Sequence, residues 1–142
     1  MREIRYGVNS MKKVWIFWIA FMALMISVAF AEDEMIYTHG DYEYRITDEL
    51  EYYFSSSEGK CVAITDYLGS ASNLIIPDQL DGIPVGLVDP MAFYHCNTLE
   101  SVTVPEGVRG IMRSAFEWCE SLCEVHLPST LDVIDDYAFF RC

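Results

Sequence analysis

A repeat with a period of 23 residues constrains this chain more than any other feature of its sequence. The motif Ala-Phe-x-x-Cys begins at residue 92, again at residue 115 and again at residue 138. Pro105 and Pro128, which close the patterns Val-x-Val-Pro and Val-x-Leu-Pro, keep the same spacing. A unit of this length cannot bury its own apolar edge, so successive units must stack to share one core. The sequence therefore predicts a solenoid of about three coils.

Each repeat predicts one short strand that ends at a proline. Segments 74–76, 102–104 and 125–127 alternate apolar and other side chains, as strands do when one face covers a core. Proline donates no hydrogen bond to a sheet, so it favours a corner at the end of a strand. The first copy carries five additional residues, which we place in a surface turn within 80–85. We expect the strands to form a parallel sheet and each Ala-Phe-x-x-Cys motif to form a short helical turn.

Two kinds of side chain should repeat in register through the core. The phenylalanine of each motif should stack on the next, and the cysteine should fill the same small buried slot in every coil. The chain has five cysteines, which permit disulfides if it is exported. Side chains stacked in parallel point alongside one another, however, so we expect reduced thiols. These structural ladders are Phe93, Phe116 and Phe139, and Cys96, Cys119 and Cys142.

The N-terminal region predicts a signal peptide over residues 1–31. Val14 to Ala31 is apolar apart from Ser27, follows two lysines, and ends in Ala-Phe-Ala before an acidic stretch. This order of charged, apolar and small residues is typical of a leader that is cleaved after Ala31. An uncleaved membrane anchor is the alternative, because eighteen apolar residues could just span a bilayer. Met11 also resembles a natural start, which would place residues 1–10 upstream of it.

The remaining chain divides into three predicted regions. Residues 32–41 form an acidic linker, and residues 42–70 form an N-terminal cap of antiparallel strands, among them Leu50–Phe54. The repeats occupy 71–98, 99–121 and an incomplete coil at 122–142. The last coil has no polar terminal unit, so we expect end-to-end self-association, or a chain that is a truncated part of a larger surface protein.

The combined pattern L-x-x-V-x-(V/L)-P followed by I-x-x-x-A-F-x-x-C resembles the BspA-like (Treponema pallidum type) leucine-rich repeats of bacterial surface proteins, over residues 71–142. The resemblance implies a secreted or cell-surface adhesion module that contacts host or microbial macromolecules through its solenoid. One departure concerns the residue after the inward Val or Ile. The family usually has glycine there, whereas this chain has Asp89, Met112 and Asp135.

Composition and motifs argue against several other functions. The net charge of −13 repels phosphate backbones, so we expect no nucleic-acid partner. The sequence contains no phosphate-binding glycine loop and no G-x-S-x-G elbow. Cys123-x-x-His126 and the pair His95-Cys96 are too few ligands to predict a zinc site. We expect no enzyme activity, cofactor or metal; a structural spacer, or less readily a small hydrolase that uses Cys123 or His126, is the alternative.

Strand alternation also predicts a binding surface. If Val102, Val104, Val125 and Leu127 face inward, the intervening residues face out from the sheet, where solenoids commonly bind partners. Tyr94, Trp118 and Phe140 flank the turns and either anchor a partner or lie flat over neighbouring coils. The predicted sheet-face site is Asn73, Ile75, Ser101, Thr103, Glu124 and His126.

Overall fold

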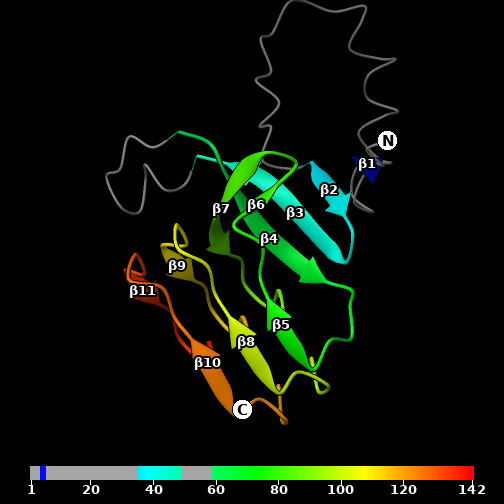
Figure 1. Ribbon diagram of the computed structural model, residues 1–142, viewed down its shortest axis with the longest axis vertical. Coiled ribbons are helices and arrows are strands. Elements are labelled where there is room, and N and C mark those ends of the chain that lie inside the picture. Colours follow the sequence, from blue (N-terminus) through cyan, green and yellow to red (C-terminus); the bar gives the residue numbers. More distant parts are fainter. Residues whose placement is uncertain (1–3, 6–34, 49–58) are drawn as a thin grey trace, which may run out of the picture.

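The computed structural model describes residues 4–5, 35–48 and 59–142 (Figure 1). Most of the predicted leader, and the expected strand Leu50–Phe54, lie outside the described residues. Within the described ranges no helix is long and apolar enough to cross a membrane. The described part of the chain consists of strands joined by turns.

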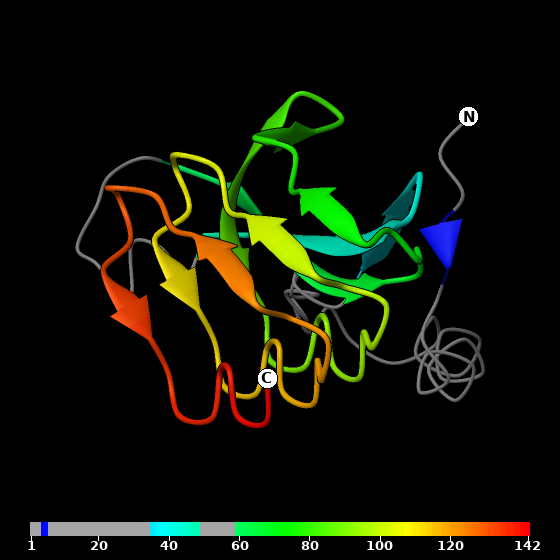
Figure 2. The ribbon, with the colours of Figure 1, turned by 60° about the horizontal axis from the view of Figure 1, so that its bottom comes forward.

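Three short strands form the parallel sheet that the repeats predict. They are β5 (Asn73–Ile75), β8 (Ser101–Thr103) and β10 (Glu124–His126), in the spatial order β10-β8-β5. Their register is that of the repeat, because Leu74 pairs with Val102 and Val102 with Val125. The solenoid prediction is therefore confirmed, with successive coils side by side (Figure 2).

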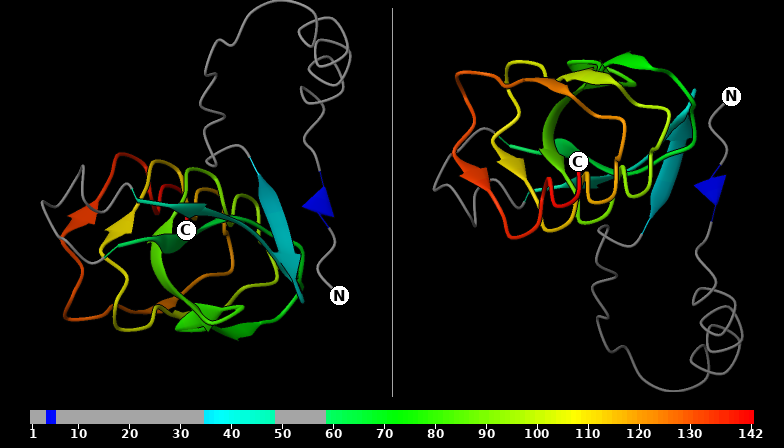
Figure 3. Two further views of the ribbon diagram at one scale, coloured as in Figure 1. Left: turned by 90° about the horizontal axis from the view of Figure 1, so that it is seen from above. Right: turned by 90° about the horizontal axis from the view of Figure 1, so that it is seen from below.

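A second sheet runs along another side of the coils (Figure 3). Its parallel part contains β4 (Cys61–Tyr67), β7 (Ile83–Val88), β9 (Gly110–Ile111) and β11 (Val133–Ile134). Sequence analysis did not predict β9 and β11, because a strand of two residues is too short to show alternation. Each of the last two coils thus contributes a strand to both sheets.

The cap is continuous with this second sheet. β3 (Tyr42–Thr47) pairs antiparallel with β4, and β4 pairs in parallel with β7 of the first coil. β2 (Ile36–His39) pairs with β3 through a turn at Gly40, whose φ is 59°. The segment 32–41, which was expected to be a linker, therefore contains a strand of the sheet, because β2 pairs with β3. The short β1 (Ile4–Arg5) pairs with β2 at the edge.

The additional residues of the first copy form a turn, as expected. β6 (Gln79–Leu80) pairs antiparallel with the start of β7. Asp81 and Gly82 connect the two strands with φ values of 51° and 81°. Two consecutive positive φ values favour Asp-Gly in a tight hairpin, so this hairpin projects from the coil.

The prediction of helical turns is wrong. In the first coil, Ala92 N–H donates to Asp89 O within the same coil, whereas Phe93 N–H donates to Ala115 O of the next coil at 2.8 Å. An α-helix would direct every N–H group to its own chain segment, but here alternate groups join neighbouring coils. The turns reverse direction at left-handed residues in equivalent positions, namely Met91, Ser114 and Tyr137, and His95, Trp118 and Arg141.

The core is built around stacked phenylalanine rings. The rings of Phe93 and Phe116 lie 4.7 Å apart at 8°, and those of Phe116 and Phe139 lie 5.1 Å apart at 4°. Tyr67 of the cap packs on Phe93 at 5.3 Å, so the cap covers the first coil. Phe93 and Phe116 are fully buried, while Phe139 is only partly covered because it has a coil on one side.

Candidate functional site

The three-stranded sheet turns two columns of side chains outward. Asn73 pairs with Ser101, which pairs with Glu124, and two residues further on Ile75, Thr103 and His126 align in the same way. The inward residues between these columns, Leu74 and Val102, are buried, and Val125 is partly covered. The structure therefore brings the six residues of the predicted sheet-face site together on one surface.

This sheet face is polar with one large apolar exception. Ser101 Oγ donates a hydrogen bond to Asn73 Oδ1 at 2.7 Å, and His126 Nε2 lies 3.1 Å from Glu124 Oε1. Ile75 is 76% exposed, the most of any large hydrophobic residue in the described chain. An exposed apolar side chain flanked by hydrogen-bonding groups is suited to contact a partner.

One inward position departs from expectation. Val104 is buried, but Leu127, its equivalent in the third coil, is 45% exposed. The difference arises because Val104 is covered by coils on both sides, whereas Leu127 has a neighbouring coil on one side only. Strand alternation alone predicts the direction of a side chain but not how much of it is covered.

Cys123 and His126, the two residues considered for a hydrolase, contact other residues rather than each other. Cys123 Sγ donates to the carbonyl oxygen of Glu100 at 3.4 Å, and His126 pairs with Glu124. Both residues are exposed, His126 in β10 and Cys123 directly before that strand. Among the described residues, no group of three His, Cys, Asp or Glu side chains is placed to hold a metal ion.

The cysteines of the repeats are free thiols that bond to neighbouring coils. Cys119 Sγ donates to Phe93 O and Cys142 Sγ donates to Phe116 O, both at 3.1 Å. The hydrogen bond between Cys96 and Cys119 lowers the pKa of Cys96 and, together with burial, raises the pKa of Cys119. Burial also raises the pKa of Cys142. Cys119 therefore remains a protonated donor, and its position serves coil stacking.

The three aromatic residues that flank the turns do not share one column. Tyr94 and Phe140 occupy equivalent positions, whereas Trp118 aligns with His95 and Arg141. The Trp118 ring stacks on His95 at 5.4 Å and 14°, and the Arg141 guanidinium lies 4.2 Å from its centroid. Trp118 thus lies flat over neighbouring coils, while Tyr94 and Phe140 are 37% and 45% exposed.

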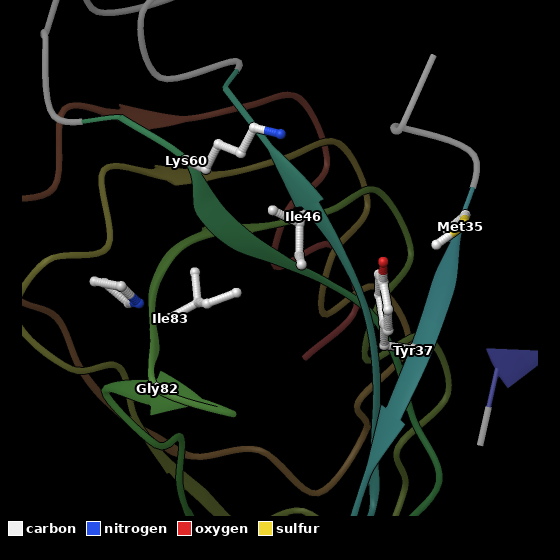
Figure 4. A pocket seen from close by; sticks show the side chains of 7 residues that line it. Met35, Tyr37, Ile46, Lys60, Gly82 and Ile83 are labelled. Atoms are coloured by element: carbon white, nitrogen blue, oxygen red, sulfur yellow. The ribbon is translucent and has the colours of Figure 1, made fainter. Parts of the chain in front are cut away.

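A pocket of about 450 Å³ opens between the cap and the β6–β7 hairpin (Figure 4). Sequence analysis missed it, because its walls come from segments that are distant along the chain. Among the described residues that line it, Lys60 carries the one charged group, and the other side chains are mostly apolar. It offers no set of converging polar groups that could support catalysis. Its lining residues are Met35, Tyr37, Ile46, Lys60, Gly82, Ile83 and Pro84.

Parallel coils with a ladder of core rings and an outward strand face define a leucine-rich-repeat solenoid, a class that presents extended surfaces to partners. Residues 86–142 match the profile described as "BspA type Leucine rich repeat region (6 copies)". The repeat region of this chain belongs to that family of bacterial surface proteins, whose fold is generally used for protein binding.

Solved structures agree with this assignment. The leucine-rich-repeat protein TpLRR of T. pallidum is 34% identical with a TM-score of 0.63, over 72% of this chain and 44% of that protein. A leucine-rich-repeat protein from Bacteroides capillosus is 29% identical with a TM-score of 0.59, over 73% of each chain. The chain thus spans less than half the length of the T. pallidum protein. No curated protein matches the chain.

Proposed function

We propose that this chain is a secreted or cell-surface module that binds proteins or other cell-surface macromolecules through its sheet face, without catalysis. The observation that carries the proposal is the register of β5, β8 and β10, which aligns six outward side chains across three coils. Membership of the repeat region in a family of bacterial surface proteins supports the same role.

The chemistry of the sheet face suits adhesion better than turnover. Two pairs of its polar groups bond along the surface, namely Ser101 with Asn73 and His126 with Glu124. Catalysis requires groups held around a reacting atom in a site that excludes water, whereas Ile75 and its neighbours lie open to solvent. A surface of three strands is small, so we expect one contact of modest affinity rather than a tight complex.

The test replaces two neighbouring side chains of the sheet face with bulky charged ones. We expect the double variant Thr103→Arg with His126→Arg to lose capture of immobilised extracellular-matrix proteins or whole bacteria, while its melting temperature stays nearly unchanged. Both substitutions point away from the core, so folding should not require either native side chain.

A matched control carries the same charge change elsewhere. Gln79→Arg with Thr98→Arg alters two exposed residues that lie outside the three-stranded sheet. We expect this variant to retain capture. Undiminished capture by the Thr103 and His126 variant would refute the sheet-face proposal, and equal loss in both double variants would point to charge alone.

A further inference from the structure

A second surface, on the turn side of the coils, carries a continuous row of rings and guanidinium groups. The Tyr137 ring centroid lies 5.8 Å from Arg113 Cζ and 5.6 Å from the Phe140 centroid. The Phe140 centroid in turn lies 5.6 Å from Arg141 Cζ. Arg141 then covers Trp118, which stacks on His95. We call this row the turn strip, and its members are Arg113, Tyr137, Phe140, Arg141, Trp118 and His95.

The repeat explains why these side chains meet. His95, Trp118 and Arg141 occupy equivalent turn positions with φ values of 61°, 65° and 61°, so their planar groups lie one above the next. The turns of the three coils run in a row along one edge of the solenoid (Figure 2). The turn strip thus crosses all three coils on a different side from the sheet face.

The two arginines of the turn strip are unusual in so acidic a chain. The chain has 22 acidic and 9 Lys or Arg residues, and both Arg45 and Arg109 form ion pairs, with Asp89 and Asp132. Arg113 and Arg141, by contrast, make no ion pair or side-chain hydrogen bond to any residue of the described ranges. Both are exposed, so their N–H donors face solvent.

A guanidinium that stacks on a ring keeps its in-plane donors available. These donors form a rigid fork that matches a carboxylate. Tyr137 and Phe140, which are 54% and 45% exposed, lie between the two arginines. Arginine and aromatic residues dominate the energetic centres of protein interfaces. The turn strip therefore combines anion recognition with apolar contact.

We propose that the turn strip docks an acidic polypeptide surface, one that presents carboxylates beside apolar side chains. This interface is separate from the sheet face and does not depend on the function proposed for it. The whole-chain charge of −13 opposes a long polyanion such as nucleic acid. At physiological salt, however, charges are screened beyond ~8 Å, so a short segment would respond to the charges near the turn strip. These are the two arginines and the carboxylates of Glu117 and Asp136, which adjoin Trp118 and Tyr137 in the chain.

The geometry favours a polypeptide over a carbohydrate. A sugar ring needs an open aromatic face, and at the centre of the turn strip both faces of Trp118 are covered, by His95 and by Arg141. Three coils spaced ~4.8 Å apart give the turn strip a length of ~10 Å. That length matches about three residues of extended peptide, so an alternation of acidic and aromatic residues fits it.

The experiment uses Trp118 as a reporter at the centre of the turn strip. In the full chain carrying W15F and W18F, Trp118 is the one tryptophan left. We titrate it, by tryptophan-selective fluorescence at physiological salt, with an eight-residue peptide that alternates glutamate and tyrosine. A peptide that alternates lysine and tyrosine and a heparin oligosaccharide serve as comparison probes.

We expect a saturable change in Trp118 fluorescence with the glutamate peptide and none with the other two probes. The double variant R113Q with R141Q should bind the glutamate peptide ~10-fold more weakly, because close charge pairs across an interface change affinity by at least this factor. R109Q is the matched control for one arginine, because it removes a positive charge that is paired elsewhere, and it should bind like the parent.

Three results would overturn the proposal. They are no saturable response to the glutamate peptide, an equal response to the lysine peptide, and equal weakening in R109Q and in R113Q with R141Q. If the first of these results comes with a saturable response to heparin, the strip recognises a sulfated glycan instead. Unchanged melting temperatures, expected because both arginines are exposed, establish that any loss reflects binding rather than folding.

Discussion

Arg45 of β3 holds the carboxylate of Asp89, at the end of β7, with two hydrogen bonds. Nε lies 2.7 Å from Oδ2, and Nη2 lies 3.1 Å from Oδ1. Both side chains are largely buried, at 15% and 10% exposed. Asp89 occupies the position where the family resemblance leads one to expect glycine. The acidic residue thus joins the cap to the first coil.

We predict that Asp89→Asn destabilises the chain by about 3 kcal/mol, because it removes the charge of a carboxylate that bonds twice to the largely buried Arg45 guanidinium. Urea unfolding followed by circular dichroism measures the change. Asp132→Asn is the control, since it breaks the exposed pair with Arg109 and should cost less than ~1 kcal/mol. Equal losses at the two sites would contradict a specific role for the Arg45–Asp89 pair.

Phe116→Ala should destabilise the chain more than Phe139→Ala. Phe116 is fully buried between two rings, so its removal leaves a cavity and should cost ~3 to 5 kcal/mol. Phe139 stacks on one ring and is only partly covered. Denaturant midpoints of dilute, monomeric samples provide the comparison, and equal small losses would argue against stacked coils.

The thiols should differ in reactivity according to their burial. Cys61 and Cys119 are 3% and 0% exposed, whereas Cys123 is exposed. We predict that iodoacetamide modifies Cys123 in the native protein and reaches Cys61 and Cys119 only after unfolding, as read by peptide mass spectrometry. The raised pKa of Cys119 acts in the same direction, because the thiolate is the reactive form. Fast native labelling of Cys119 would contradict this packing.

Amides at the last coil should exchange quickly in dilute solution. Ser114, Phe116 and Trp118 donate their N–H groups to the third coil at 3.1, 2.7 and 2.9 Å. The equivalent N–H groups of Tyr137, Phe139 and Arg141 have no acceptor within the described ranges. Val133 and Ile134 nearby are 38% and 49% exposed, so we also predict concentration-dependent association through this edge.

Hydrogen exchange and light scattering at several concentrations test both parts of this prediction. Association should slow exchange at residues 137–141 and raise the scattered mass together. A stable monomer whose amides at 137–139 are protected at every concentration would be the opposite result.

We predict that the exported protein begins at Glu32, because the apolar run ends in Ala-Phe-Ala immediately before it. Intact mass of the protein recovered outside the cell measures the cleavage point. Cleavage there would also remove β1, so the second sheet would begin at β2. A recovered mass that retains residues 14–31 would indicate an uncleaved anchor instead.

The sequence by itself determined the coils, their strand register and the composition of the core ladder. Three residue types that recur 23 positions apart can satisfy their burial only if the coils are stacked. The outward residues of the sheet face follow from the same argument, since alternate side chains of a strand point to opposite faces.

Only the tertiary structure decided the turns, the second sheet and the partners of individual charges. A local sequence does not reveal that alternate N–H groups, such as that of Phe93, bond to the next coil, and this pairing replaces a helix with turns. Nor does it reveal that Asp89 faces Arg45, or that Arg141 covers Trp118, because these contacts join segments far apart in the chain. Such contacts depend on how the coils and cap are placed in space, which periodicity does not specify.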